Sequence, residues 1–121
     1  KVAKPDKQVI ALTGDGSFGM NGFEIDTAVR ENLPVVTVIC NNGGWTADHP
    51  PKPGRDLPFT SYDRIVEVLG GHGERVERPE DIRPALERAA KAGVPACVNV
   101  ICDPAAKSET TRFSSYFQQQ H

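Results

Sequence analysis

The chain has 121 residues, of which 38% are hydrophobic, and its 14 Lys and Arg against 16 Asp and Glu give a net charge of −2. This balance is ordinary for one globular domain, and it excludes the strongly basic surface that is typical of nucleic-acid binders. The longest apolar run, residues 34–40, is far shorter than the roughly 18 residues that a membrane-spanning helix needs.

The three cysteines are few and scattered, at Cys40, Cys97 and Cys102. Such usage is typical of a reducing compartment rather than of a disulfide framework. The polar residues 1–8 are not followed by the apolar stretch of a signal peptide. We therefore expect a cytoplasmic protein with no membrane segment.

The N-terminal third of the chain predicts a strand, a turn, a helix and a second strand. Residues 9–12 form an apolar run, which predicts a strand buried on both faces of a parallel sheet. The glycine-rich residues 14–22 predict a turn, and helical spacing predicts a helix over 23–32 that ends before Pro34. β-Branched residues predict a second buried strand over 35–40.

The rest of the chain continues the alternation of helices and strands. Residues 62–69 and 79–92 predict helices, residues 75–77 a short strand, and residues 96–102 a buried strand. Alternating strands and helices predict an α/β fold with a mainly parallel sheet flanked by helices.

Two segments have no regular period. Residues 41–61 are rich in proline and predict a long loop, which inside a compact domain is usually functional. Residues 105–121 are polar and end in glutamines, so we expect a tail or a lid. The domain itself is expected over residues 1–104.

The run Gly14-Asp15-Gly16-Ser17-Phe18-Gly19 follows the first predicted strand and admits several interpretations. It can be a tight turn that needs glycines. It also matches the G-x-G-x-x-G pattern of an NAD-dependent oxidoreductase, but Asp15 would set a carboxylate beside a pyrophosphate, and no acid ends the strand over 35–40. A P-loop is excluded because no Gly-Lys-Ser/Thr follows.

A magnesium–diphosphate clamp accounts for Asp15. Asp15 follows the first strand and Asn42 follows the second, and the carboxyl ends of adjacent parallel strands meet at one edge of the sheet. Mg²⁺ prefers oxygen ligands and often bridges protein and phosphate. The backbone N–H groups of Gly16 and Ser17 can bind phosphate oxygens, and the Gly44 carbonyl can supply a third ligand.

The Gly14-Asp15-Gly16 segment and the Asn41-Asn42 pair, separated by residues 17–40, resemble the signature of thiamine diphosphate-dependent enzymes. The resemblance covers roughly residues 9–109 and implies the C-terminal cofactor-binding domain, with thiamine diphosphate and Mg²⁺ as cofactors. It implies that Mg²⁺ is held by Asp15, Asn42 and Gly44. The implied cofactor contacts are Gly14, Gly16, Ser17, Asn42, Gly44 and Trp45.

Residues 19–25, 32–35, 41–44 and 70–73 look most like the 2-hydroxyacyl-CoA lyase and oxalyl-CoA decarboxylase branch of the acetolactate synthase superfamily. This resemblance implies a lyase or decarboxylase that cleaves a C–C bond next to a carbonyl, in a 2-oxo acid or a 2-hydroxyacyl-CoA thioester. Residues 45–48 depart from that branch, and an acetolactate synthase-like carboligase is the alternative.

The resemblance also implies that the chain is the C-terminal portion of a larger subunit. In relatives, the glutamate that activates the cofactor belongs to a separate N-terminal domain, so no catalytic residue is expected in this segment, and the segment alone is expected to be inactive. The implied partners are those N-terminal domains, a small-molecule substrate and further copies in a homodimer or homotetramer. An NAD-dependent oxidoreductase and a non-catalytic fragment are the alternatives from other classes.

Overall fold

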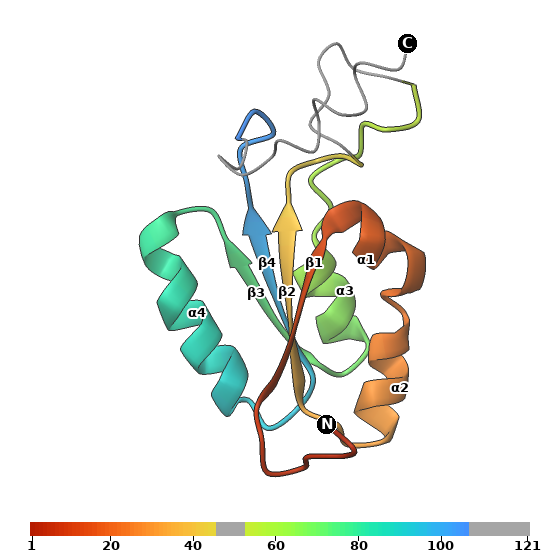
Figure 1. Cartoon of the computed structure of the whole chain (residues 1–121), viewed down its shortest axis with the longest axis vertical. Coiled ribbons are helices and arrows are strands. Elements are labelled where there is room, and N and C mark those ends of the chain that lie inside the picture. The colour runs from red at the N-terminus through yellow and green to blue at the C-terminus, as the bar shows by residue number, and fades with distance from the viewer. Residues whose placement is uncertain (46–52, 107–121) are drawn as a thin grey trace.

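A computed structural model describes residues 1–45 and 53–106 of the chain. Its four strands are all parallel and lie in the order β1-β2-β4-β3. Helices α1, α2 and α3 cover one face of the sheet, and α4 covers the other (Figure 1). This arrangement confirms the predicted α/β fold. In chain order the elements are β1 (Val9–Gly14), α1 (Asp15–Asn21), α2 (Glu24–Arg30), β2 (Val35–Asn41), α3 (Tyr62–Val68), β3 (His72–Val76), α4 (Pro79–Lys91) and β4 (Ala96–Ile101).

The sheet separates two hydrophobic cores, because successive side chains of a strand point to opposite faces. Ile39 of β2 and Cys97 of β4 pack towards α1, α2 and α3, together with Phe18, Ile25, Tyr62 and Val66. Val36 of β2 and Val98 of β4 pack towards α4, together with Val76, Ala85, Ala89 and Ala96. The two central strands, β2 and β4, therefore carry core residues on both faces.

Helix α4 has the local signals of a well-bounded helix. Pro79 occupies the first turn, two acidic residues follow it, and basic residues stand in the last turn. Both charge placements favour the helix dipole. Gly93 follows the helix with a φ of +71°, a conformation that glycine adopts without strain. No helix within residues 1–45 and 53–106 has the length and apolar character needed to cross a membrane.

The prediction that the first strand is buried on both faces was wrong. In β1, Ile10 is 59% exposed and Leu12 is 73% exposed. β1 lies at the edge of the sheet, and α4 packs on β3 and β4 instead of reaching it. A continuous apolar run indicates that a strand can be buried on both faces. Whether a helix covers each face depends on the strand order and on the helix packing.

The predicted glycine turn over 14–22 was also wrong, because Asp15–Asn21 forms helix α1. The aromatic ring of Phe18 anchors this helix to the core, where it packs edge-on against Tyr62 with ring centroids 5.0 Å apart. Tertiary packing of one buried face compensates for the low helix propensity of the two glycines within α1.

Candidate functional site

The carboxyl ends of β1 and β2 bring the predicted site residues together. Gly14 lies opposite Cys40 in the sheet register, so α1 begins beside the end of β2. Asp15, the first residue of α1, is only 1% exposed. Its Oδ2 atom accepts a hydrogen bond from the backbone N–H of Gly44, at 2.9 Å. The start of α1 and the segment after β2 thus meet at the carboxylate of Asp15, although Asp15 and Gly44 are 29 positions apart in the sequence.

The side-chain amide of Asn42 completes a cluster of polar atoms around Asp15. One terminal atom of this amide lies 3.1 Å from Asp15 Oδ1 and 3.0 Å from the Gly44 carbonyl oxygen. With the nitrogen in that place, the amide donates hydrogen bonds to both oxygens. With the oxygen there, it is separated from the carboxylate oxygen and from the carbonyl oxygen by the spacing of neighbouring ligands around a cation with metal–oxygen distances of about 2.1 Å. The residues present therefore fit a Mg²⁺ ion.

These groups line a pocket of about 240 Å³ at the carboxyl edge of the sheet. Every residue predicted to contact the cofactor or the metal is part of its wall. Cys40 also lines it, whereas the sequence predicts this residue only as a position in the buried strand over 35–40. The lining residues are Gly14, Asp15, Gly16, Ser17, Cys40, Asn42, Gly44 and Trp45.

The ring of Trp45 lies directly over the start of α1. A Cβ atom added to Gly16 would come within 2.9 Å of Trp45 Cδ2, so glycine is the residue that permits this contact. The first N–H groups of a helix have no partner inside the helix, and here no side chain caps them. Backbone donors therefore face the pocket from the first turn of α1.

The loop predicted over 41–61 is ordered where the structure describes it. The N–H of Trp45 donates to Arg55 O at 2.9 Å, and the N–H of Leu57 donates to Gly43 O at 2.8 Å. Gly43 has a φ of +71°, and a Cβ atom there would come within 3.2 Å of Leu57 O. The segment that carries the Gly44 carbonyl is thus held by a short antiparallel contact, while residues 46–52 and the predicted tail beyond residue 106 lie outside the described residues.

A buried polar network beneath this loop was not predicted. Asn41, with a side chain that is fully buried, donates from Nδ2 to Asn99 Oδ1 and to Thr60 O, both at 3.1 Å. Asn99 donates in turn to Asp63 Oδ1 and Thr60 O, both at 3.0 Å. The first asparagine of the pair therefore points into the protein rather than into the pocket. The sequence feature that indicates this network is Asn99, a polar residue inside the apolar run over 96–102.

The two cysteines of β4 and its end differ in environment. Burial raises the pKa of the Cys97 thiol to about 12, with a further contribution from the nearby Asp63 charge. Burial also raises the pKa of Cys102, which is only partly enclosed.

Within residues 1–45 and 53–106, no three His, Cys, Asp or Glu side chains form a metal-binding group. Among these described residues, the donor set that suits a cation is therefore the mixed one of carboxylate, amide and carbonyl oxygens around Asp15.

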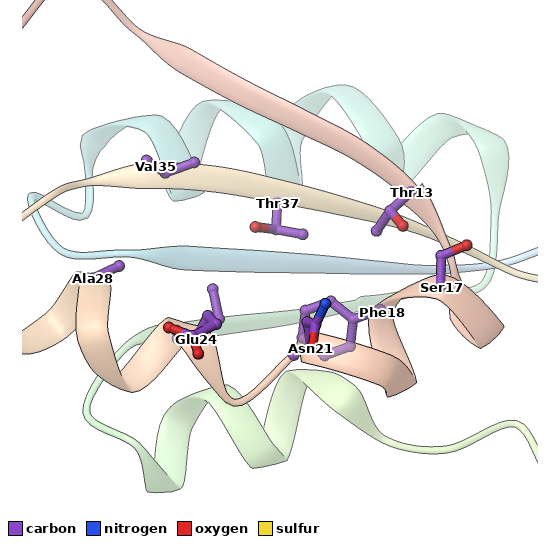
Figure 2. A pocket seen from close by; sticks show the side chains of 10 residues that line it. Thr13, Ser17, Phe18, Asn21, Glu24, Ala28, Val35 and Thr37 are labelled. Atoms are coloured by element: carbon purple, nitrogen blue, oxygen red, sulfur yellow. The ribbon is translucent and has the colours of Figure 1, made fainter. Parts of the chain in front are cut away.

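A second hollow, of about 300 Å³, lies between the sheet and helices α1 and α2 (Figure 2). Thr13 and Thr37 face it from the strands, and Asn21 and Glu24 face it from the helices. It shares only Ser17 with the pocket around Asp15. The two hollows are therefore distinct, and the predicted site residues gather in the smaller one.

Comparison with known proteins shows the family of this chain. The family described as thiamine pyrophosphate enzyme, C-terminal TPP binding domain, matches residues 1–100. A probable acetolactate synthase of Mycobacterium bovis is 50% identical over 112 residues, which covers 86% of this chain and 20% of the relative. A 2-hydroxyacyl-CoA lyase of Arabidopsis thaliana is 39% identical over 124 residues, covering 92% of this chain and 22% of the relative.

A solved structure shares the fold. The thiamine diphosphate-dependent 4-hydroxybenzoylformate decarboxylase of Rhodococcus jostii RHA1 aligns with a TM-score of 0.76 and 30% identity, over 88% of this chain and 22% of that chain. The present chain thus spans about a fifth of the length of the relatives it matches. It belongs to the thiamine pyrophosphate enzymes, within their C-terminal cofactor-binding domain.

Proposed function

We propose that this domain binds the diphosphate of thiamine diphosphate through a Mg²⁺ ion held by Asp15, Asn42 and Gly44. The observation that carries the proposal is the convergence of oxygen-bearing groups from these three residues in one pocket. A buried carboxylate supplies the negative charge that a divalent cation requires. Family membership supports the same cofactor.

Each wall of the pocket has a distinct part in this proposal. Asp15 and Asn42 fix the cation at the sheet edge, and the N–H groups of Gly16 and Ser17 bind the diphosphate from the first turn of α1. The Trp45 ring closes one side of the pocket and excludes water. When bound, thiamine diphosphate supplies the carbanion chemistry, whereas this domain supplies position and charge compensation.

The full natural chain is proposed to break a C–C bond next to a carbonyl, in a 2-hydroxyacyl-CoA thioester or a 2-oxo acid. The 39% identity to a 2-hydroxyacyl-CoA lyase over 92% of the chain supports this class. An acetolactate synthase-like carboligase is the second candidate, and the 50% identity to a probable acetolactate synthase favours it. Under either activity, further N-terminal domains and a homodimer or homotetramer complete the enzyme.

The cofactor site is tested by calorimetric titration of the full natural chain with thiamine diphosphate, with and without Mg²⁺. We expect Mg²⁺-dependent binding that Asp15→Ala and Asn42→Ala each weaken by at least about 100-fold, because each removes a direct ligand. Asp26→Ala, at an exposed acid of α2, is the control and should bind normally. Full Mg²⁺-dependent affinity in Asp15→Ala, or binding of NAD in place of thiamine diphosphate, would disprove the clamp.

The choice between the two activities needs a product assay. The full chain is incubated with a 2-hydroxyacyl-CoA thioester or with pyruvate, each with Mg²⁺ and thiamine diphosphate. An aldehyde product from the thioester identifies a lyase, whereas acetolactate from pyruvate identifies a carboligase. Retained cofactor binding without either product would reject both activities while leaving the clamp intact.

A further inference from the structure

Two cysteines come together at the rim of the cofactor pocket. Cys40 lies opposite Val100 in the register of β2 and β4, and Cys102 follows Val100 by two residues, so Cys40 and Cys102 share one face of the sheet. The Cys102 N–H donates to Asn41 O at 2.8 Å, which keeps this residue beside β2. Cys102 is therefore a diagonal neighbour of Cys40 across β2 and β4, and the Cys40 side chain contributes to raising the pKa of the Cys102 thiol.

These two thiols differ from the third cysteine in access. Cys40 is exposed and lines the pocket, and Cys102 is partly exposed. Cys97 is fully buried on the opposite face, in the core beneath α1, α2 and α3. An oxidant can therefore reach Cys40 directly, and Cys102 is the cysteine placed to react with it next.

We propose that Cys40 and Cys102 form a redox-sensitive pair that hydrogen peroxide converts into a disulfide. Peroxide transfers one oxygen to the Cys40 sulfur, which gives a sulfenic acid and releases one water. The Cys102 sulfur then forms the S–S bond as the S–O bond breaks, and its proton leaves with the hydroxide as a second water. Two thiols thus lose two electrons and two protons in all, and peroxide is reduced.

The position of the pair gives the disulfide a consequence for the site, which rests on the proposed function. Cys40 stands two residues before Asn42 and forms part of the pocket wall. Cys102 directly follows β4, where the chain leaves the sheet, so a movement of this segment can bring the sulfurs to the roughly 2 Å of a disulfide bond. Because the Cys102 N–H donates to Asn41 O, this movement also shifts the end of β2 that precedes Asn42, and we expect cofactor affinity to fall at least tenfold.

The test treats the full natural chain with graded hydrogen peroxide, blocks the remaining thiols with an alkylating agent and maps the peptides by mass spectrometry. We expect a Cys40–Cys102 cross-link that dithiothreitol reverses, together with weaker binding of thiamine diphosphate and Mg²⁺ in the oxidised protein. Cys97→Ser should form the same cross-link, whereas Cys102→Ser should form none. Bound cofactor should protect Cys40 from peroxide.

Peroxide treatment that leaves both thiols open to alkylation would overturn the pair, as would cross-links through Cys97 or between chains. A mapped Cys40–Cys102 disulfide without loss of affinity would reject its effect on the site. The reduced protein is titrated first: if it fails to bind thiamine diphosphate, the proposed function is wrong, and the mapped disulfide still decides the chemistry of the pair.

Discussion

At the scale of single residues, the pocket around Asp15 depends on the absence of a side chain at Gly16. The Trp45 ring occupies the space that a Cβ atom at Gly16 would need, and Trp45 is itself 44% exposed. The indole can therefore move outward at small cost to the fold. Its displacement would nevertheless open one side of the proposed cofactor pocket.

Gly16→Ala and Gly19→Ala separate these two effects within one helix. Alanine favours the helix by about 0.5–1 kcal/mol at an unhindered position, and at Gly19 its Cβ would lie an ordinary 3.6 Å from Tyr62 Oη. We expect Gly19→Ala to stabilise the protein and to bind cofactor normally. Gly16→Ala should lose this gain and bind thiamine diphosphate more weakly, as measured by urea unfolding and calorimetry. Equal behaviour of the two variants would contradict the Trp45 contact.

At the scale of elements, buried polar side chains tie the ends of β2 and β4 to the start of α3. Asn99 is the central residue of this network, because it accepts from Asn41 and donates to Asp63. All three side chains lie in the interior, where an unpaired polar group is costly.

Asn99→Ala leaves polar groups of both neighbours without partners, so we expect it to lower the free energy of unfolding by about 2–4 kcal/mol. Asn21→Ala, at an exposed position of α1, should change it by no more than about 0.5 kcal/mol. Chemical denaturation of both variants measures the difference. A mild effect of Asn99→Ala would show that the network adds little to stability.

A second link joins β3 to α4 and depends on pH. Arg88 donates two hydrogen bonds of 2.8 Å to Glu74, and these chiefly hold the pKa of Glu74 below its ordinary value, with a smaller contribution from His72. A carboxyl whose pKa is lower in the folded state stabilises the fold above its unfolded pKa, and this stabilisation is lost as the pH falls through the folded pKa.

Glu74→Gln should therefore be less stable than the unchanged protein at neutral pH, and the gap should close as the pH falls below the usual range of a glutamate. Thermal unfolding across a pH series measures the gap. Glu77→Gln is the matched control, because Glu77 is 64% exposed and pairs with Arg75 in solvent. A difference in stability between Glu74→Gln and the unchanged protein that does not vary with pH would rule out the charge of Glu74 as its cause.

At the scale of the whole molecule, the sheet is covered unevenly. α4 leaves the adjoining face of β1 open, where Ile10 and Leu12 are both largely exposed. Exposed apolar side chains on an edge strand favour association. The relatives of this chain are about five times as long. The open face of β1 is therefore a surface suited to burial against another protein segment.

We expect the 121-residue chain, prepared alone, to associate as its concentration rises, and Leu12→Lys to suppress that association. A charge on the open face opposes its burial. Val94→Lys adds the same charge before β4 and should leave association unchanged. Sedimentation velocity over a concentration series distinguishes them, and a chain that stays monomeric at every concentration would contradict the expectation.

The sequence predicted the alternation of elements, the parallel sheet and the residues around the pocket. The periodic apolar residues over α2, β2 and α4 predict these elements, because the period depends only on residues that are close in the sequence. Asp15 and Asn42 were predicted to meet because parallel strands end at one edge, and the structure brings them together. Helix α1 was missed because its glycines have low propensity, and the packing of Phe18 against the distant Tyr62 outweighs that propensity.

The amino-acid sequence by itself determined the fold class, the family and the chemistry of the donor set, since these depend on side-chain types and short spacings. Only the tertiary structure decided that β1 is an open edge, that Asn41 and Asn99 share a buried network, and that Cys40 lies beside Cys102. Each of these facts joins residues of different elements. Such pairings follow from the strand order β1-β2-β4-β3, which no local pattern contains.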